Sequence, residues 1–335
     1  MESPIIEMAG ELLETNKKLI TYIVALGSSI FGFILLRWYV AGGVCVSKKR
    51  LDGKTVIITG CNTGIGLETA KELSARGARI IMACRDLDKA DKASEIVKKF
   101  SGNSDVSVER LDLASLDSVR KFAEKVNEEE AKIDILINNA GVMMCPKWQS
   151  EDGYEMQFAV NHLGHFFLTT LLLNRIKESA PSRIVNVSSI AHNYGQINFE
   201  DINNDKKYSP MYAYGQSKLA NILFTKELAR RLQGTGVTTN CLHPGAINTE
   251  LIRHVEGWFH PFIFKCIQPL IIFLKTPLQG AQTTLHCVLD ERLDTVSGKY
   301  FSDCAEKQPT RAAMNMEDAK RLWELSEEMV TKATK

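Results

Sequence analysis

The sequence predicts an α/β protein in which one doubly wound parallel sheet follows an N-terminal membrane-anchor helix. Short β-branched runs such as Thr55–Thr59 alternate with helical patterns along most of the chain. This alternation is typical of parallel sheets that carry helices on both faces. An uncharged apolar run, Ile20–Leu36, precedes the first of these units. Because no internal repeat or long linker divides the remainder, we expect an anchor with its flanks at 1–50 and one domain at 51–335.

The composition argues against several classes of function. The chain has 335 residues, of which 44% are hydrophobic and 24% are charged, as in ordinary globular proteins. A formal net charge of +1 and the lack of a dense basic stripe predict no nucleic-acid partner. The eight cysteines are scattered without a C-x-x-C pair, so we expect no metal site and a reducing compartment.

The apolar run Ile20–Leu36 is near the lower limit of length for a bilayer span, which needs about 17–25 residues. Arg37 can reach the headgroups, and Trp38 and Tyr39 suit the membrane interface. Acidic residues before the run disfavour a cleaved signal peptide, and a buried core helix is disfavoured because the first folded motif begins near Leu51. More basic residues follow the run than precede it, which favours a main domain facing the cytosol.

A glycine-rich turn connects the first strand to a helical pattern at Leu67–Ala75. The turn reads Gly60-Cys-Asn-Thr-Gly64-Ile-Gly66. Its glycines allow close backbone approach to a diphosphate, and the free N–H groups at the helix start carry partial positive charge. The strand, turn and helix together predict a Rossmann-like dinucleotide-binding unit. Cofactor contacts are expected from Gly60, Asn62, Thr63, Gly64, Ile65 and Gly66.

The second strand, Arg79–Cys84, indicates which dinucleotide binds. In NAD-preferring folds an acidic residue near the end of this strand binds the ribose hydroxyls. Here Arg85 holds that position and Asp86 follows it. Because a guanidinium suits a 2′-phosphate, we expect NADP(H). The alternative is that Arg85 is a surface residue at the start of the helix from Leu87.

Tyr214 and Lys218 lie four residues apart in a helical pattern, so their side chains share one helix face. A phenol has a reference pKa of about 10, and a nearby ammonium favours its ionised form. The pair would then bring a proton within reach of a reaction. Such pairs also occur by chance on solvated helices. In the same way, Asn161 alone could cap a helix, and Ser188 and Ser189 could be turn residues at the end of a fifth strand.

These residues gain weight from their order along the chain. Over about residues 51–302 the sequence resembles the short-chain dehydrogenase/reductase family in its classical form. The matching motifs, in order, are Thr59-Gly60-x3-Gly64-Ile65-Gly66, Asp112, Asn138-Asn139-Ala140-Gly141, Asn161, Ser189, Tyr214-x3-Lys218 and Pro244-Gly245-x3-Thr249. Ala83-Cys-Arg85-Asp86 and Val160-Asn-His-Leu-Gly-His-Phe166 further resemble the membrane-anchored, NADP-preferring retinol dehydrogenases.

The resemblance implies a role for each catalytic residue. Tyr214 would act as general acid or base, Lys218 would lower its pKa and bind the nicotinamide ribose, and Ser189 would hydrogen-bond the substrate oxygen. Asn161 would support a water that links Lys218 to solvent. Further cofactor contacts are expected from Asp112, Leu113, Asn138, Ala140, Gly141, Tyr214, Lys218, Pro244, Gly245 and Thr249. The nearby histidines are expected to be packing residues, namely His162, His165 and His243.

The implied activity is NADP(H)-dependent interconversion of retinal and retinol, mainly as a retinal reductase. A substrate lobe is expected at about 246–277, where the apolar stretch Leu251–Lys275 could cover a lipophilic substrate, touch the bilayer, or form ordinary core or a dimer contact. The same residues would serve other lipophilic carbonyls, such as steroids or lipid aldehydes, or a non-catalytic binding protein of this fold. The resemblance also admits a homodimer through the helices that contain Asn161 and Tyr214. The acidic N-terminus disfavours a mitochondrial presequence and so favours the endoplasmic reticulum membrane, and the resemblance leaves a mitochondrial membrane as the alternative.

Overall fold

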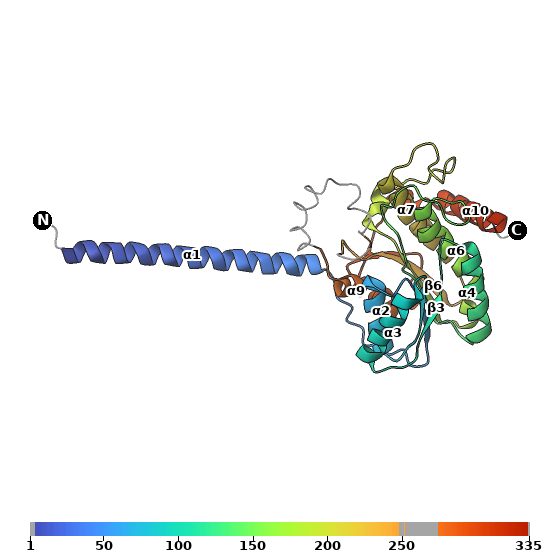
Figure 1. Ribbon diagram of the computed structural model, residues 1–335, viewed down its shortest axis with the longest axis horizontal. Coiled ribbons are helices and arrows are strands. Elements are labelled where there is room, and N and C mark those ends of the chain that lie inside the picture. Colours follow the sequence, from blue (N-terminus) through green and yellow to red (C-terminus); the bar gives the residue numbers. More distant parts are fainter. Residues whose placement is uncertain (1–3, 248–250, 252–273, 334–335) are drawn as a thin grey trace. The chain divides into compact units, whose positions relative to one another are not determined.

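The computed structural model describes residues 4–247, 251 and 274–333, and it divides into two units between residues 42 and 43 (Figure 1). The division precedes the expected boundary at residue 50, because the intervening residues hydrogen-bond to the larger unit. The backbone N–H of Cys45 donates to Gln282 Oε1 at 3.1 Å, and Ser47 Oγ donates to the carbonyl of Leu289 at 3.0 Å. Residues 43–50 therefore belong to the larger unit.

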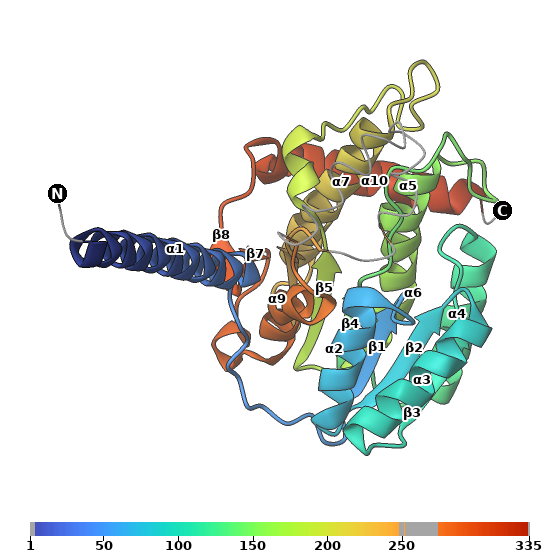
Figure 2. The same cartoon turned by 60° about the vertical axis from the view of Figure 1, so that its left-hand side comes forward.

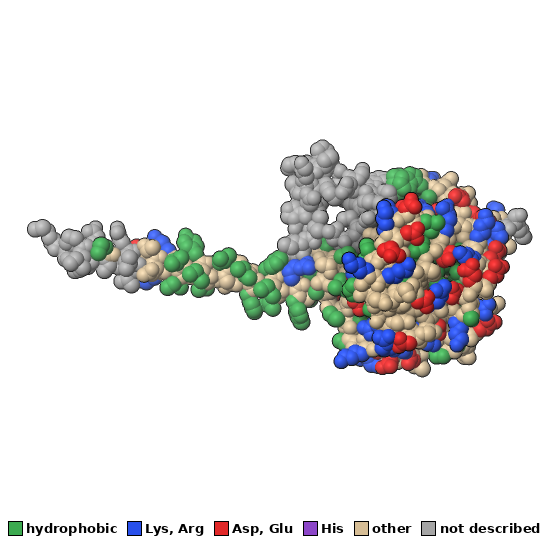
Figure 3. Space-filling model, turned by 60° about the horizontal axis from the view of Figure 1, so that its bottom comes forward, with side chains coloured by type: hydrophobic (Ala, Val, Ile, Leu, Met, Phe, Trp, Pro, Cys, Tyr) green, Lys and Arg blue, Asp and Glu red, His purple; other side chains and the backbone are tan. Residues whose placement is uncertain are grey.

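The smaller unit is the helix α1, Pro4–Ala41. Within it, Glu14–Ala41 is long and apolar enough to cross a membrane, and none of its most apolar window is buried. Figure 3 shows hydrophobic side chains spread along this helix. At 1.5 Å per residue its 28 residues reach about 42 Å, more than a hydrocarbon core of about 30 Å. α1 is therefore a candidate membrane anchor, as predicted, and it extends beyond the uncharged run Ile20–Leu36.

Eight strands form one sheet in the described part of the larger unit, in the order β3-β2-β1-β4-β5-β6-β7-β8. Their bounds are β1 (Thr55–Thr59), β2 (Arg79–Cys84), β3 (Val106–Arg110), β4 (Ile135–Asn138), β5 (Ser182–Val187), β6 (Val237–His243), β7 (Tyr300–Ser302) and β8 (Ala305–Lys307). Neighbouring strands run parallel as far as β7, and β8 runs antiparallel to β7. The predicted doubly wound parallel sheet is confirmed, with one antiparallel strand added at its edge.

Helices cover both faces of this sheet (Figures 1 and 2). One face carries α2 (Gly64–Ala75), α3 (Leu87–Ser101) and α9 (Pro277–Leu289), and the other carries α4 (Leu116–Glu129), α6 (Gly164–Glu178) and α7 (Pro210–Arg231). Among the described residues, the other helical segments of the larger unit are α5 (Met156–Phe158), a π-helical stretch (Ala159–Leu163), α10 (Met316–Ala333) and the 3-10 turns Ile190–Tyr194, Glu291–Leu293 and Ala312–Met314. Each face of the sheet therefore has its own hydrophobic core.

Burial on both faces explains the β-branched composition of the central strands. All five residues of β1 are buried, as in other parallel strands that helices cover on both sides. α3 begins where the side chain of Asp86 accepts the backbone N–H of Lys89, and it ends at Gly102, whose φ of +68° is left-handed. These caps fix the point at which the chain leaves β2 and turns into α3.

The antiparallel strand β8 is a difference from the all-parallel expectation. Ser302 pairs with Ala305, and only Asp303 and Cys304 lie between them. Both have positive φ angles, +53° and +56°, which is the backbone of a tight two-residue hairpin. The sequence lacks the Asn-Gly or Asp-Gly signal that normally indicates this turn, so the hairpin was not predicted.

The C-terminal helix α10 packs against α6 and α7 on the outer side of the domain. Its central contact is Trp323, whose ring lies 4.9 Å from that of Phe166 and 5.8 Å from that of Phe224. The guanidinium of Arg231 covers the same ring at 4.2 Å. Part of the surface on which a homodimer contact was expected is therefore covered by the chain's own C-terminal helix.

Replacing this ring should destabilise the domain. We expect Trp323→Ala to lower the free energy of unfolding by about 3–5 kcal/mol, because it leaves a cavity among buried aromatic rings. Met316→Ala, at an exposed position of the same helix, should cost about 0.5 kcal/mol or less. Urea unfolding of the detergent-solubilised protein measures both, and similar losses for the two variants would contradict the packing described here.

Candidate active site

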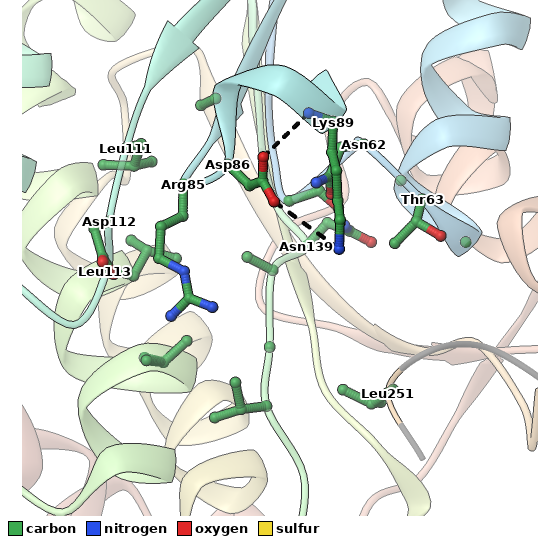
Figure 4. A pocket seen from close by; sticks show the side chains of 18 of the residues that line it. Asn62, Thr63, Arg85, Asp86, Lys89, Leu111, Asp112, Leu113, Asn139 and Leu251 are labelled. Carbon is green, nitrogen blue, oxygen red and sulfur yellow. Dashed lines mark hydrogen bonds and ion pairs between the residues drawn. The ribbon is translucent and has the colours of Figure 1, made fainter. Parts of the chain in front are cut away.

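The candidate site lies at the carboxyl ends of the parallel strands. In the sheet, β1 lies between β2 and β4. The chain builds β1, β2 and β3 in one direction and then crosses to the other side of β1 to form β4. Connections from neighbouring strands then leave on opposite faces, and a crevice opens between them. A cavity of about 410 Å³ lies there (Figure 4). The expected cofactor contacts that line it are Gly60, Asn62, Thr63, Gly64, Ile65, Gly66, Arg85, Asp112, Leu113, Ala140 and Gly141.

The glycine-rich turn has the shape that a bound diphosphate needs. Gly60 has a φ of +62°, and a Cβ there would lie 2.7 Å from the Cβ of Ala140. A Cβ on Gly66 would lie 2.6 Å from Asn139 Nδ2. Thr63, at the N-cap of α2, makes no side-chain hydrogen bond to the first turn. The N–H groups at the start of α2 can therefore receive an anionic group, and the residues present fit a dinucleotide.

Arg85 extends from the end of β2 into the cavity, and Asp86 and Lys89 lie beside it (Figure 4). The carboxylate of Asp86 accepts the backbone N–H of Lys89 at 3.1 Å and lies 3.9 Å from its Nζ. Arg85 forms no ion pair with any residue in the part of the chain that the structure describes. The acidic group is thus engaged by its own helix, while the guanidinium can meet an anion.

Asn138, which was expected to contact the cofactor, lies in the core. It is 2% exposed, and its Nδ2 donates to Thr169 Oγ1 at 3.0 Å and to Asn186 Oδ1 at 2.7 Å. The neighbouring Asn139 lines the cavity, and its Nδ2 donates to the carbonyl of Thr59 at 2.8 Å. Asn138 therefore ties β4 to β5 and α6, whereas Asn139 holds the glycine-rich turn against the loop after β4.

The helix α7 carries Tyr214 and Lys218 one turn apart, close to the end of β5. Tyr214 is 4% exposed and hydrogen-bonds with the side chain of Ser189. Lys218 Nζ donates to the carbonyl of Val187 at 3.1 Å and lies 5.7 Å from the centre of the Tyr214 ring. Ser188 Oγ donates to the carbonyl of Lys218 at 2.7 Å, so this serine braces α7. Of the two serines, Ser189 is the one that the structure brings to the tyrosine.

Asn161 lies in the π-helical stretch Ala159–Leu163, which connects α5 to α6. Its Oδ1 accepts the backbone N–H of Val142 at 2.8 Å, and its Nδ2 donates to the carbonyl of Val142 at 2.9 Å. A Cβ on Gly141 would lie 3.1 Å from Asn161 Oδ1 and 3.5 Å from Lys218 Nζ. The amide of Asn161 and the ammonium of Lys218 therefore flank the same backbone segment. The four expected catalytic residues meet at the carboxyl ends of the central strands.

Burial dominates the ionisation of the tyrosine–lysine pair. It raises the pKa of Tyr214 to about 12, although the hydrogen bond with Ser189 opposes the rise. It lowers the pKa of Lys218 to about 8. Lys218 was expected to lower the pKa of Tyr214, but the pKa is raised. The reason is that a buried phenolate would lose its contact with water, which disfavours the ionised form. Tyr214 therefore stays protonated at neutral pH, as a proton donor must be.

The chain after β6 turns at Pro244 and Gly245, which do not line the cavity. Gly245 has a φ of +100°, and its N–H donates to His243 Nδ1 at 3.4 Å. The same nitrogen accepts the backbone N–H of Ile190 at 3.2 Å. Burial lowers the pKa of His243 to about 4, so its ring is a neutral acceptor. His243 therefore connects this turn to the residue after Ser189.

Sequence reasoning missed part of the cavity wall. The additional lining residues are Ala83, Asp86, Lys89, Leu111, Asn139, Val142, Val160 and Leu251. Most of them are neighbours in sequence of a residue in one of the motifs. Their position next to a motif or at the end of a strand is the sequence feature that could have predicted them. Thr249 and most of the substrate lobe expected at 246–277 lie outside the described residues.

The fold and this site define an oxidoreductase that uses a nicotinamide cofactor. Residues 54–258, more than half of the chain, match the sequence profile of the short chain dehydrogenase family. The chain belongs to this family, so the predicted family is confirmed.

Similar proteins support the same assignment over nearly the whole chain. Retinol dehydrogenase 13 of Mus musculus is 52% identical over 310 residues, which cover 92% of this chain and 93% of that protein. Retinol dehydrogenase 12 of Homo sapiens is 50% identical over 315 residues, which cover 92% of this chain and 98% of that protein. Among solved structures, an uncharacterised protein from Mycobacterium paratuberculosis has a TM-score of 0.69 and 37% identity, covering 87% of this chain and 98% of that one.

The buried lysine predicts a pH-dependent stability. The pKa of Lys218 is about 8 in the folded protein against an ordinary value of 10.5, so between these pH values the unfolded chain binds more protons than the native one. The contribution of this group to the free energy of unfolding should therefore rise with pH from 8 to 10.5, by about 3 kcal/mol at most. Urea unfolding should show this rise relative to Lys218→Met, which cannot titrate. Identical pH dependence of the two proteins would contradict it.

Proposed function

We propose that this protein is an NADP(H)-dependent oxidoreductase that interconverts retinal and retinol and works mainly as a retinal reductase. The observation that carries the proposal is the meeting of the four expected catalytic residues beside a cavity that fits a dinucleotide. The choice of a retinoid rests on relatives that are 50–52% identical over most of the chain and are named retinol dehydrogenases.

The residues of the site suit carbonyl reduction. Tyr214 would donate its hydroxyl proton to the substrate oxygen, and Ser189 would hydrogen-bond that oxygen as negative charge develops. The chemistry that a bound nicotinamide cofactor supplies is hydride transfer to the carbonyl carbon. Lys218 is positively charged below its pKa of about 8 and would favour loss of the proton from Tyr214. Asn161 would hold the loop after β4, and in alcohol oxidation Tyr214 would act as the base.

The charges at the adenosine end of the cavity favour NADP(H) over NAD(H). Arg85 and Lys89 both line this wall, and a 2′-phosphate would meet two cations there. Asp86, the acidic residue that could bind ribose hydroxyls, is held by the backbone N–H of Lys89. Use of the reduced NADP pool would in turn drive the reaction toward the alcohol.

Removing the arginine should change the choice of cofactor. We expect Arg85→Gln to weaken NADPH binding by about 10- to 100-fold and to leave NADH binding almost unchanged, because only NADPH carries the additional phosphate. Lys99→Gln, an exposed change at the far end of α3, should affect neither. Fluorescence titration of each variant with both dinucleotides measures this. Equal weakening of NADPH and NADH binding would contradict the assigned role of Arg85.

We further propose that α1 anchors the enzyme in the endoplasmic reticulum membrane, with the larger unit in the cytosol. The length and apolar composition of Glu14–Ala41 support the anchor. The excess of basic residues after the apolar run supports the orientation. Mitochondrial membranes are the alternative location. An anchored enzyme would work beside the bilayer into which a retinoid partitions.

The function is tested by NADPH consumption of the membrane-bound protein with all-trans-retinal, decanal and a 3-ketosteroid. We expect the highest kcat/KM with retinal. Tyr214→Phe should lower turnover by about 100- to 10,000-fold and retain NADPH binding, because it removes the proton donor and little else. Tyr212→Phe, two residues earlier, loses one hydrogen bond to the carbonyl of Gln196 and should keep its activity.

The other outcomes are equally informative. Turnover of decanal or the steroid with retinal inert would change the substrate and keep the catalytic residues. Unchanged turnover in Tyr214→Phe would refute the mechanism. NADPH binding without turnover of any carbonyl would favour a non-catalytic binding protein of the same fold.

A further inference from the structure

His165 in α6 is a buried side chain to which the mechanism above gives no role. It is 2% exposed, and both of its ring nitrogens are paired. Nδ1 lies 3.1 Å from the backbone carbonyl oxygen of Asn161, and Nε2 lies 2.8 Å from Thr59 Oγ1. The ring therefore joins the helical stretch that carries the catalytic asparagine to the end of β1, where the glycine-rich turn begins.

The partners of His165 determine the direction of both hydrogen bonds. A carbonyl oxygen only accepts, so Nδ1 carries the proton and donates to Asn161, and Nε2 accepts the hydroxyl proton of Thr59. Burial lowers the pKa of His165 to about 4, so the ring remains neutral at physiological pH. Thr59 Oγ1 in turn accepts the backbone N–H groups of Asn139 and Ala140, each at 2.9 Å.

This chain of hydrogen bonds ends at two functional positions. At one end is the loop after β4, whose residues line the cavity. At the other end is Asn161. Its Oδ1 and Lys218 Nζ both lie close to Gly141, at 3.1 and 3.5 Å from where a Cβ of that residue would be. The charge of Lys218 is also close enough to contribute to the lowered pKa of His165. The imidazole thus lies between the cofactor loop and the surroundings of the catalytic lysine.

We propose that His165 is a positioning residue for the reaction: one hydrogen bond holds the Asn161 carbonyl in the site, and the other holds Thr59 and through it the cofactor-binding loop. The inference rests on the proposed function, because it takes Asn161 and Lys218 as catalytic. His165 itself transfers no proton. A misplacement of about 1 Å at the reacting groups can lower turnover by about 100-fold, so loss of these two bonds should be measurable.

His162 provides a matched control three residues earlier, in the π-helical stretch that leads into α6. It is 1% exposed, and its Nε2 lies 2.9 Å from Ser326 Oγ in α10. Its ring packs against those of Phe158, Phe166 and Phe224. The hydrogen bond leads to the C-terminal helix, and the three phenylalanines belong to the hydrophobic core and do not line the cavity. Replacing either histidine by phenylalanine removes one buried imidazole with little change in shape.

The experiment compares variants of both histidines in the full-length, membrane-bound enzyme. His165→Phe removes both hydrogen bonds, and we expect kcat to fall about 10- to 100-fold and the Kd for NADPH to rise about tenfold. His165→Asn places an amide near Nδ1 and should restore kcat but not NADPH affinity. His165→Gln reaches the place of Nε2 and should restore NADPH affinity but not kcat. His162→Phe should lower Tm yet leave kcat per folded enzyme within about twofold.

A purely structural role for His165 predicts a different result. All three of its variants would then lower Tm, with kcat per folded enzyme and NADPH affinity like those of His162→Phe, and the proposal would be overturned. Failure of the retinal reductase proposal is distinguishable. If the wild type reduces another carbonyl, the comparison is made with that substrate. If it reduces none, NADPH affinity decides: recovery in His165→Gln over His165→Phe supports the proposal, and equal affinity refutes it.

Discussion

The double hydrogen bond between the side-chain amide of Asn161 and the backbone of Val142 is the contact on which the rest of the site depends. It attaches the helical stretch before α6 to the loop after β4, and that stretch is widened into a π-helix instead of a regular turn. The carbonyl of Asn161 is then available to His165. Because Gly141 lacks a Cβ, Asn161 Oδ1 can lie close to this loop, and Lys218 Nζ reaches the same loop from α7. The loop after β4 and the helices α6 and α7 are thus connected to one another at the site.

Exclusion of water then sets the protonation states at this site. The rise in the pKa of Tyr214 to about 12 keeps a proton on the phenol. The pKa of Lys218 falls to about 8, which is still above neutral pH, so most of the lysine remains positively charged. The pKa values of His165 and His243 fall to about 4, so both rings act as neutral connectors with fixed partners. Among the residues that the structure describes, Lys218 Nζ donates to the carbonyl of Val187 and not to a carboxylate. Its charge therefore remains unneutralised and can act on the tyrosine.

How much of this can be predicted from sequence depends on the range of each interaction. The strand Thr55–Thr59 and the glycine-rich turn are local patterns; the strand was predicted with the correct bounds, whereas α2 begins at Gly64, three residues before its predicted start. The family resemblance favoured Ser189, and the structure gives it the tyrosine as partner. Asn138 was expected at the cofactor, yet successive residues of a strand point to opposite faces, so it faces the core while its neighbour faces the cavity. His165 meets a threonine 106 residues away, and no local pattern encodes such a contact.

The same reasoning explains why an acidic residue after β2 does not by itself indicate NAD. The carboxylate of Asp86 accepts the N–H of Lys89 and so satisfies one of the unpaired donors at the start of α3. Turning it toward ribose hydroxyls would uncap the helix, at about 1 kcal/mol. Arg85, one residue earlier, has no competing ion pair among the described residues and points into the cavity. Because Asp86 is held as the cap of the helix, Arg85 is free to meet the adenosine end of a dinucleotide under the cofactor choice proposed above.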